Sequence, residues 1–250
     1  MRRLAAAALA VLTTTLTPAF GAGDLVDRVS RTIALPPGTA IRVDATIADL
    51  AIAAADRRDV QIEIERRAPA RTDFARFPVA VEAGDQELHV SVVQTDDRRD
   101  PRLKSTITIA APAAAVFASV RVFEGRVRMT NVRSAADVDI RRGVIDATRI
   151  AGRVRLESGI GGIDVRDSEL TRDGMMRLRV FNGPLHVKLR QRPSNARILA
   201  VTLNGGITSD IPLAMKDKFG PRFGETTIGS GDPVLSMDVV KGDISVSVGK

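Results

Sequence analysis

Apolar and polar residues alternate along most of the chain, and glycine interrupts the alternation at regular points. Six stretches between residues 120 and 248 share one order: an alternating strand, a glycine and a second alternating strand. The first five of these glycines are separated by 18, 18, 22 and 22 residues. Successive side chains of a strand point to opposite faces, so each stretch predicts two short strands with one apolar face. The six central residues are Gly125, Gly143, Gly161, Gly183, Gly205 and Gly242.

The register of the stretches is most regular after the glycine. An aliphatic residue stands two positions after every one of them: Val127, Ile145, Ile163, Leu185, Ile207 and Ile244. Before the glycine, the apolar pattern is displaced by two residues at Gly161 and by one at Gly205, which we interpret as longer and shorter turns. Glycine reaches positive φ without a steric penalty, and Asn182-Gly183 and Asn204-Gly205 are typical of tight turns. Each stretch therefore predicts a glycine turn between two strands.

A single stretch is too small to bury its own apolar face. A recurrence close to twenty residues with strand content predicts an all-β fold in which short strands stack as the rungs of a β-solenoid, similar to a β-helix. An antiparallel β-sandwich built from hairpins would show the same stretches and stays open as the alternative. The composition suits stacked aliphatic rungs, because Trp and Tyr are absent and Phe occurs only eight times.

Residues 22–118 carry a less regular form of the same pattern, ahead of the regular repeats in residues 119–250. Ala48-Asp49 stands where the first rung would have its glycine turn. Alternation is clear at Val60, Ile62 and Ile64, with Gln61, Glu63 and Glu65 predicted to face water, and again at Leu88, Val90 and Val92. No linker rich in glycine, serine or proline interrupts the chain, so residues 22–250 predict one domain.

The first 21 residues have the three parts of a secretory signal peptide. Arg2 and Arg3 precede an apolar run, and Ala19-Phe20-Gly21 offers small residues for cleavage after Gly21. A membrane anchor is the alternative, but the apolar run is shorter than the ~20 residues that span a bilayer. We therefore expect export to the periplasm or the cell surface, with no stable membrane span after cleavage. The chain has no cysteine, so disulfides and thiolate metal sites are excluded.

The charge does not indicate a nucleic-acid partner. Removal of Arg2 and Arg3 lowers the formal net charge from +7 to +5, and the remaining arginines are interleaved with acids. Nucleic-acid readers concentrate positive charge beside stacking aromatics or a recognition helix. Solvated strand faces account for this distribution, and a weak attraction to anionic lipids or polysaccharides is the alternative.

The opening LPPGTAIRVDATIADLAI, the glutamate-bearing strand after Asp59 and the closing NGGI and KGDISVSV phrases resemble a bacterial family of exported β-strand-repeat proteins of unknown function. Its members carry the labels "putative adhesin" and toast-rack-like. The resemblance covers roughly residues 32–249. It implies a β-solenoid-like fold and an envelope or cell-surface location, and it supplies no catalytic residues.

Candidate chemistry is sparse. His89 and His186 are predicted at outward positions of separate strands, where solvated histidines are common. Residues 158–167, SGIGGIDVRD, approach two motifs: a calcium-binding repeat and a dinucleotide glycine fingerprint. The first needs tandem copies and the second needs a following helix, and neither context is present.

Three aspartates at outward strand positions, Asp139, Asp146 and Asp164, have two interpretations. Paired carboxylates would suit a polysaccharide-cleaving enzyme on a β-helix. Charge pairing is favoured, because Arg121 and Asp139 occupy one offset in successive repeats, and so do Arg128 and Asp146. Neighbouring rungs would then place opposite charges side by side, worth about 0.2–1 kcal/mol per pair.

Two functions remain at this level. The favoured one is a non-catalytic envelope protein for adhesion, scaffolding or macromolecular binding, whose partner is a protein or polysaccharide of unknown identity. The alternative is a polysaccharide-acting enzyme. The sequence predicts no catalytic residues, no cofactor-binding residues and no metal ligands. A groove lined by two or more unpaired acids would favour the enzyme, whereas a flat face of mixed charges and hydroxyls would favour binding.

Overall fold

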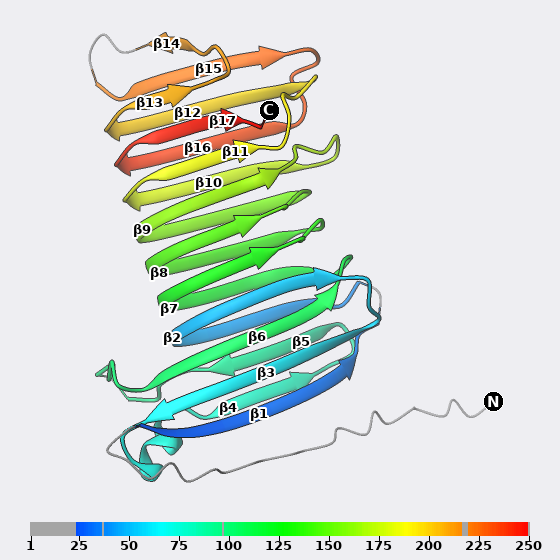
Figure 1. Cartoon of the computed structure of the whole chain (residues 1–250), viewed down its shortest axis with the longest axis vertical. Coiled ribbons are helices and arrows are strands. Elements are labelled where there is room, and N and C mark those ends of the chain that lie inside the picture. The colour runs from blue at the N-terminus through cyan, green and yellow to red at the C-terminus, as the bar shows by residue number, and fades with distance from the viewer. Residues whose placement is uncertain (1–23, 37, 97, 217–219, 250) are drawn as a thin grey trace, which may run out of the picture.

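The computed structural model describes residues 24–36, 38–96, 98–216 and 220–249. This part is all-β, with 17 strands and one 3-10 helix, η1 (Arg71–Arg76), and Figure 1 shows it as a tall stack. The predicted signal peptide, residues 1–21, lies outside the described residues. Within the residues that the structure describes, no helix has the length and apolarity that a membrane crossing requires. The strands are β1 (Leu25–Ala34), β2 (Ala40–Ala55), β3 (Asp59–Ala68), β4 (Val79–Ala83), β5 (Glu87–Val92), β6 (Lys104–Pro112), β7 (Val116–Thr130), β8 (Ala136–Thr148), β9 (Arg153–Ser168), β10 (Met175–Asn182), β11 (Leu185–Leu189), β12 (Ala196–Asn204), β13 (Ile207–Ser209), β14 (Ala214–Lys216), β15 (Arg222–Ile228), β16 (Val234–Lys241) and β17 (Ile244–Val248).

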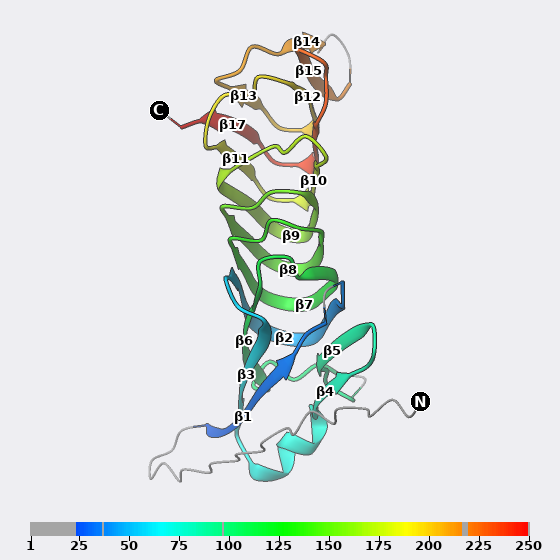
Figure 2. The same ribbon diagram turned by 90° about the vertical axis from the view of Figure 1, so that its right-hand side faces the viewer.

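Each repeat folds as a strand that reverses direction at its glycine, a unit that we call an arch. In β7, β8 and β9 the strand continues through the glycine. In the other three arches the glycine separates β10 from β11, β12 from β13 and β16 from β17. The reversals lie along the left edge of Figure 1. Seen from the side in Figure 2, the two halves of each arch occupy two facing layers.

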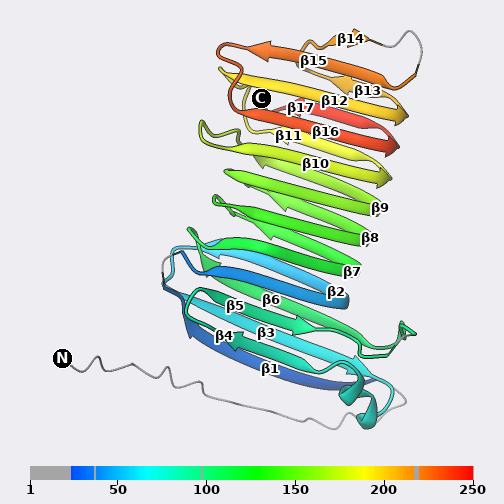
Figure 3. The same cartoon turned by 180° about the vertical axis from the view of Figure 1, so that it is seen from behind.

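Neighbouring arches pair in parallel and in register, so that Gly143 lies between Gly125 and Gly161. Ala48 of β2 lies opposite Gly125, and therefore occupies the glycine position of the first arch as the sequence predicts. The stacking order departs from chain order at the C-terminus. Strand β16 pairs with both β10 and β12, and β17 pairs with both β11 and β13. The last arch of the chain is therefore inserted between the two that precede it, as Figure 3 also shows.

The arch glycines form a column in which backbones touch. Five of them have φ between 136° and 145°, a region open mainly to glycine. A Cβ on Gly143 would overlap the carbonyl oxygen of Gly125, and one on Gly183 would overlap that of Gly161. The tight hairpin turn predicted at Asn182-Gly183 is wrong, because β10 and β11 pair with strands of neighbouring arches. The glycine is needed instead where the chain passes from one layer to the other and where the backbones of neighbouring arches approach closely.

Two apparent slips in the apolar pattern are not changes of turn length. Ser158 and Thr202 stand three positions before Gly161 and Gly205, in register with the aliphatic residues of neighbouring arches, and both are fully buried. The Ser158 hydroxyl donates to the Gly143 carbonyl oxygen at 3.0 Å, and the Thr202 hydroxyl donates to that of Gly242 at 2.9 Å. The register is therefore kept, and a hydroxyl replaces the aliphatic group in order to satisfy a buried carbonyl.

The core lies between the two layers and consists mainly of aliphatic side chains. In β7, Val120 and Val122 point inward before the glycine and Val127 and Met129 after it, and each is at most 3% exposed. Full burial of such a side chain contributes about 1.5–3 kcal/mol. Because one arch alone leaves this surface open, each arch depends on its neighbours.

The ends of the stack are antiparallel. Strand β1 pairs with β3, which pairs with β6, and β4 pairs with β5. At the other end, β15 pairs with β12 and β14 with β15. Arg66 of β3 closes the first end: its guanidinium lies over the rings of Phe74 and Phe77 and donates to both of their carbonyl oxygens. Its Nε also donates to Asp27 at 3.0 Å.

We expect Gly143→Ala to lower the free energy of unfolding by about 3 kcal/mol or more, because the side chain meets backbone and φ is unfavourable. Urea unfolding measures the change. Gly84→Ala is the control, since a Cβ there has only ordinary contact at 3.4 Å. Equal stabilities of the two variants would contradict the column of touching backbones; failure of Gly143→Ala alone to fold would support it.

Candidate functional site

The structure keeps the two histidines apart. His89 lies on β5 with its Nε2 2.8 Å from Asp44 Oδ2, and His186 lies on β11 with its Nδ1 2.6 Å from Ser245 Oγ. Within residues 24–249 as described, no three His, Cys, Asp or Glu side chains are grouped so as to hold a metal ion. Residues 158–167 lie inside the continuous strand β9, so the helix that a dinucleotide fingerprint needs does not follow them.

The predicted charge pairs occur on the predicted strands, but between different residues. Arg121 lies opposite Asp139 and Arg128 opposite Asp146 on adjacent strands, which confirms the register. The ion pairs are diagonal, however. Arg121 Nη1 lies 2.9 Å from Asp137 Oδ1, and the Asp146 carboxylate lies 3.7 Å from Arg126 Nη1. Long arginine side chains reach diagonal neighbours as readily as direct ones.

Asp139 lies in register between Arg121 of β7 and Glu157 of β9. Burial raises its pKa above the ordinary value, and the neighbouring Glu157 adds to this, while Arg121 opposes it. Its neighbour in register on the far side is Glu157, whose carboxylate pairs with Arg155 at 2.9 Å. Asp164 pairs with Arg166 on its own strand. Two of the three aspartates considered from the sequence are therefore paired, and the third lies among mixed charges.

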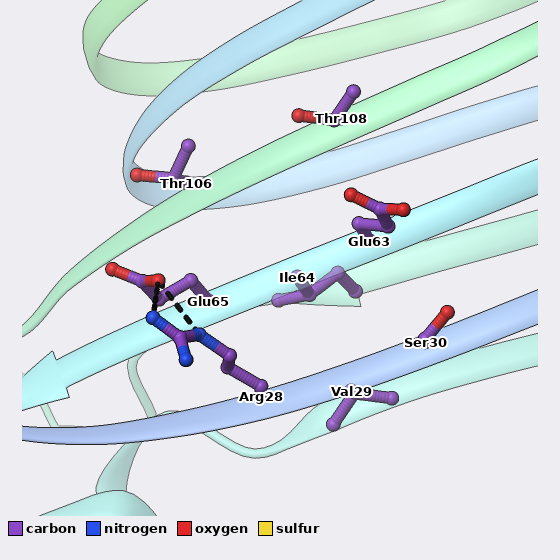
Figure 4. A pocket seen from close by; sticks show the side chains of 8 residues that line it. All are labelled: Arg28, Val29, Ser30, Glu63, Ile64, Glu65, Thr106 and Thr108. Carbon is purple, nitrogen blue, oxygen red and sulfur yellow. Dashed lines mark hydrogen bonds and ion pairs between the residues drawn. The ribbon is translucent and has the colours of Figure 1, made fainter. Parts of the chain in front are cut away.

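A hollow of about 360 Å³ lies on the outer face of β1, β3 and β6. Figure 4 shows Arg28 and Ser30 from β1, Glu63 and Glu65 from β3, and Thr106 and Thr108 from β6 around it. The antiparallel registers produce this arrangement: Arg28 faces Glu65, which faces Thr106, and Ser30 faces Glu63, which faces Thr108. Two rows of polar side chains therefore cross the three strands.

The two glutamates of the hollow differ in their partners. Glu65 pairs with Arg67 at 2.7 Å and with Arg28 at 3.0 Å. The hydrogen bond from Arg67, with further support from Arg28, holds the pKa of Glu65 below its ordinary value, against the opposing effect of burial. Glu63 accepts a hydrogen bond from Gln61 Nε2 at 2.8 Å.

This arrangement suits hydrogen bonding better than glycoside cleavage. Cleavage needs two carboxyl groups, one of them a general acid whose pKa is raised. In the hollow, the pKa of Glu65 is shifted in the opposite direction. Hydroxyl groups, one glutamate and an arginine-bound glutamate together offer donors and acceptors to a polar partner.

The sequence indicates part of this surface and misses the rest. The outward positions of Gln61, Glu63 and Glu65 are as predicted from alternation. Strand β1 is not predicted, although Val29 and Ile33 give it a partial alternation. Its antiparallel pairing with β3 joins residues that are 25 to 43 positions apart, from Ala34 with Asp59 to Leu25 with Ala68. The hollow arises from that pairing, which no local pattern indicates.

Comparisons with known proteins give structural neighbours only. No protein-family model matches the chain, and no curated protein matches it. A "putative cell adhesion protein" from Clostridium sporogenes is similar with a TM-score of 0.49 and 8% identity over 88% of this chain and 98% of that one. A "putative adhesin" from Bacteroides fragilis has a TM-score of 0.43 and 15% identity over 88% and 96% of the chains. A "putative lipid binding protein" from Parabacteroides distasonis has a TM-score of 0.25 and 11% identity over 89% and 97%.

The adhesin names agree with the family that the sequence resembles. With identities of at most 15% and TM-scores below 0.5, the three names describe those proteins and not the role of this chain.

We expect Asp139→Asn to raise the unfolding midpoint at neutral pH. Folding raises the pKa of Asp139, so ionisation of this carboxyl destabilises the folded state as the pH rises from the pKa of the unfolded chain through the pKa of the folded chain. The gain should vanish below about pH 4, where the carboxyl is protonated in the unfolded chain too. Thermal unfolding between acidic and neutral pH measures this. Asp164→Asn, which removes an arginine-paired acid, should show no such gain; a lower midpoint for Asp139→Asn at neutral pH would contradict the assignment.

Proposed function

We propose that the chain is an exported, non-catalytic envelope protein that binds a protein or a polysaccharide. In this proposal residues 1–21 are removed on export, and residues 22–250 form one β-solenoid domain in the periplasm or on the cell surface. The parallel, in-register pairing of successive arches supports the solenoid interpretation over a sandwich of hairpins. The arginines and apolar run before Gly21 support export.

The observation that carries the binding role is the polar surface of β1, β3 and β6. Glu65 is held ionised by Arg67 and Arg28, so it does not suit the role of a general acid. Ser30, Thr106 and Thr108 add hydroxyl groups around Glu63. Mixed charge and hydroxyl groups on a sheet face suit a hydrogen-bonded, partly hydrated interface.

The polysaccharide-acting enzyme is the second candidate and is tested by the same experiment. The lowered pKa of Glu65 argues against it, since glycoside cleavage needs a general acid whose pKa is raised. A polysaccharide partner would instead be held by hydrogen bonds, because the chain lacks Trp and Tyr for stacking on sugar rings.

Sedimentation of the purified mature chain with isolated envelopes of the producing cells tests the proposal. We expect saturable binding that Glu63→Lys weakens about fivefold or more, which corresponds to ~1 kcal/mol at an interface. Lys188→Glu is the control, since this exposed residue lies on β11, several arches away. Protease treatment of the envelopes distinguishes a protein partner from a polysaccharide.

Two results would contradict the proposal. Equal binding by Glu63→Lys and the control would place binding elsewhere. Release of new reducing ends from envelope polysaccharide, abolished by Glu63→Gln, would establish the enzyme instead.

A further inference from the structure

The most exposed large apolar side chains gather at the arch reversals. Phe181 is 62% exposed, and Ile160 and Leu203 are each 52% exposed, whereas no other large apolar residue among those described exceeds 46%. Ile160 stands one position before its arch glycine, and Phe181 and Leu203 stand two positions before theirs. We call the residues one and two positions before the six arch glycines the arch ridge. The arch reversals that carry it lie along the left edge of Figure 1, whereas the hollow around Glu63 lies on β1, β3 and β6.

The strand registers set the order of side chains along the ridge. Neighbouring arches are ~4.8 Å apart. The apolar run from Phe181 to Leu203 therefore crosses adjacent arches, and an arginine-bearing arch lies close to one end of it. In stacking order, the residues two positions before the glycines are Phe123, Arg141, Gly159, Phe181, Val240 and Leu203.

A hollow of about 670 Å³ opens on the ridge where Gly159 has no side chain. Glycine is required there for a structural reason, because a Cβ would lie 2.5 Å from the carbonyl oxygen of Arg141. The space that remains is bordered by Arg141, Arg142 and Arg179, and by the apolar Ile160 and Phe181. Cationic and apolar groups therefore border one opening.

The charge of this region is positive, although Arg142 lies in register with Glu124, and Arg179 lies in register with Glu157 and Asp238. Among the described residues, no ion-pair partner occurs for Arg141, Arg142 or Arg179, and all three are exposed. Glu157 also lines the hollow, but its carboxylate is engaged by Arg155 at 2.9 Å. The ridge itself carries one acid, Glu124, against Arg141, Arg142 and Lys241.

Two chemical requirements follow for a ligand. Three guanidinium groups around one opening match the oxygen atoms of a phosphate. A soluble phosphate, however, would make no use of the exposed Phe181, Ile160 and Leu203. Apolar side chains beside arginines are typical of protein surfaces that lie at the interface of an anionic membrane.

We propose that the arch ridge docks on an anionic phospholipid surface. A headgroup phosphate occupies the hollow between Arg141, Arg142 and Arg179, and Phe181, Ile160 and Leu203 enter the boundary between headgroups and acyl chains. The chain then lies on the membrane along one edge, which leaves the face of β1, β3 and β6 free for its own partner.

Flotation of the mature chain with protein-free vesicles tests the proposal. Vesicles of phosphatidylcholine alone are compared with vesicles that also contain phosphatidylglycerol. We expect binding only with the anionic lipid, and we expect Arg141→Glu and Phe181→Ser each to weaken it about tenfold. Salt should weaken the binding further, because it screens exposed charges.

Matched controls come from the ends of β9 and β10 that lie away from the ridge. Arg153→Glu changes an exposed arginine at the start of β9, and Met175→Ser changes an exposed apolar residue opposite it at the start of β10. Met175 is six residues from Phe181, or ~20 Å along the strand. All four substitutions are at exposed positions. Circular dichroism verifies that each variant is folded.

Each result bears on the proposal in one direction. Loss of binding in both ridge variants with full binding in both controls supports it. Equal loss in ridge and control variants would show only general electrostatic attraction and overturns it. Binding of inorganic phosphate without vesicle binding overturns the lipid surface in favour of a soluble anion. The vesicles contain no envelope protein or polysaccharide, so a negative flotation result does not affect the proposed role of the β1, β3 and β6 face. The sedimentation experiment tests that role separately.

Discussion

Contact between backbones at the arch glycines is the constraint on which the rest of the structure depends. Five of the six arch glycines have a φ that is open mainly to glycine, and at all six the neighbouring arch lies too close to admit a side chain. This contact keeps the arches in register, and the register places every aliphatic residue of one arch on those of the next. Ala48 begins the column: it has a β-carbon, but its neighbour on that side is Ser105 of β6 and not another arch.

Uniform register also explains how the C-terminal arch is inserted between its predecessors. All six arches present the same backbone contact and an aliphatic residue two positions after the glycine. The core can therefore accept the arches in an order that differs from their order in the chain. The same regularity arranges outward side chains in rows across strands. Charged side chains on these rows pair diagonally, as Arg121 does with Asp137, or within one strand, as Arg166 does with Asp164.

Local pattern predicts a large part of this fold. Alternation identifies the all-β class, the outward position of Glu63 and the adjacency of Arg121 and Asp139. Alternation fails to predict features that depend on a hydrogen bond or a strand pairing with a segment distant in sequence. Ser158 and Thr202 interrupt the apolar pattern, and the hydroxyl of each donates to a carbonyl oxygen on another arch. Strand β1, the order of the last arches and the hollow of Figure 4 depend on pairings between remote segments, which single-strand periodicity does not encode.

The stacking order offers the most direct test of the account, and a chain without cysteine is well suited to it. His186 lies beside Ser245, and Ser245 lies beside Thr208, so residues 186 and 208 are two strand spacings apart. Parallel neighbours are ~4.8 Å apart, within the Cα range of a disulfide, whereas two spacings of ~9.6 Å exceed it. Oxidation should therefore cross-link His186→Cys with Ser245→Cys and leave His186→Cys with Thr208→Cys reduced. The opposite result would mean that the arches stack in chain order and would contradict the account.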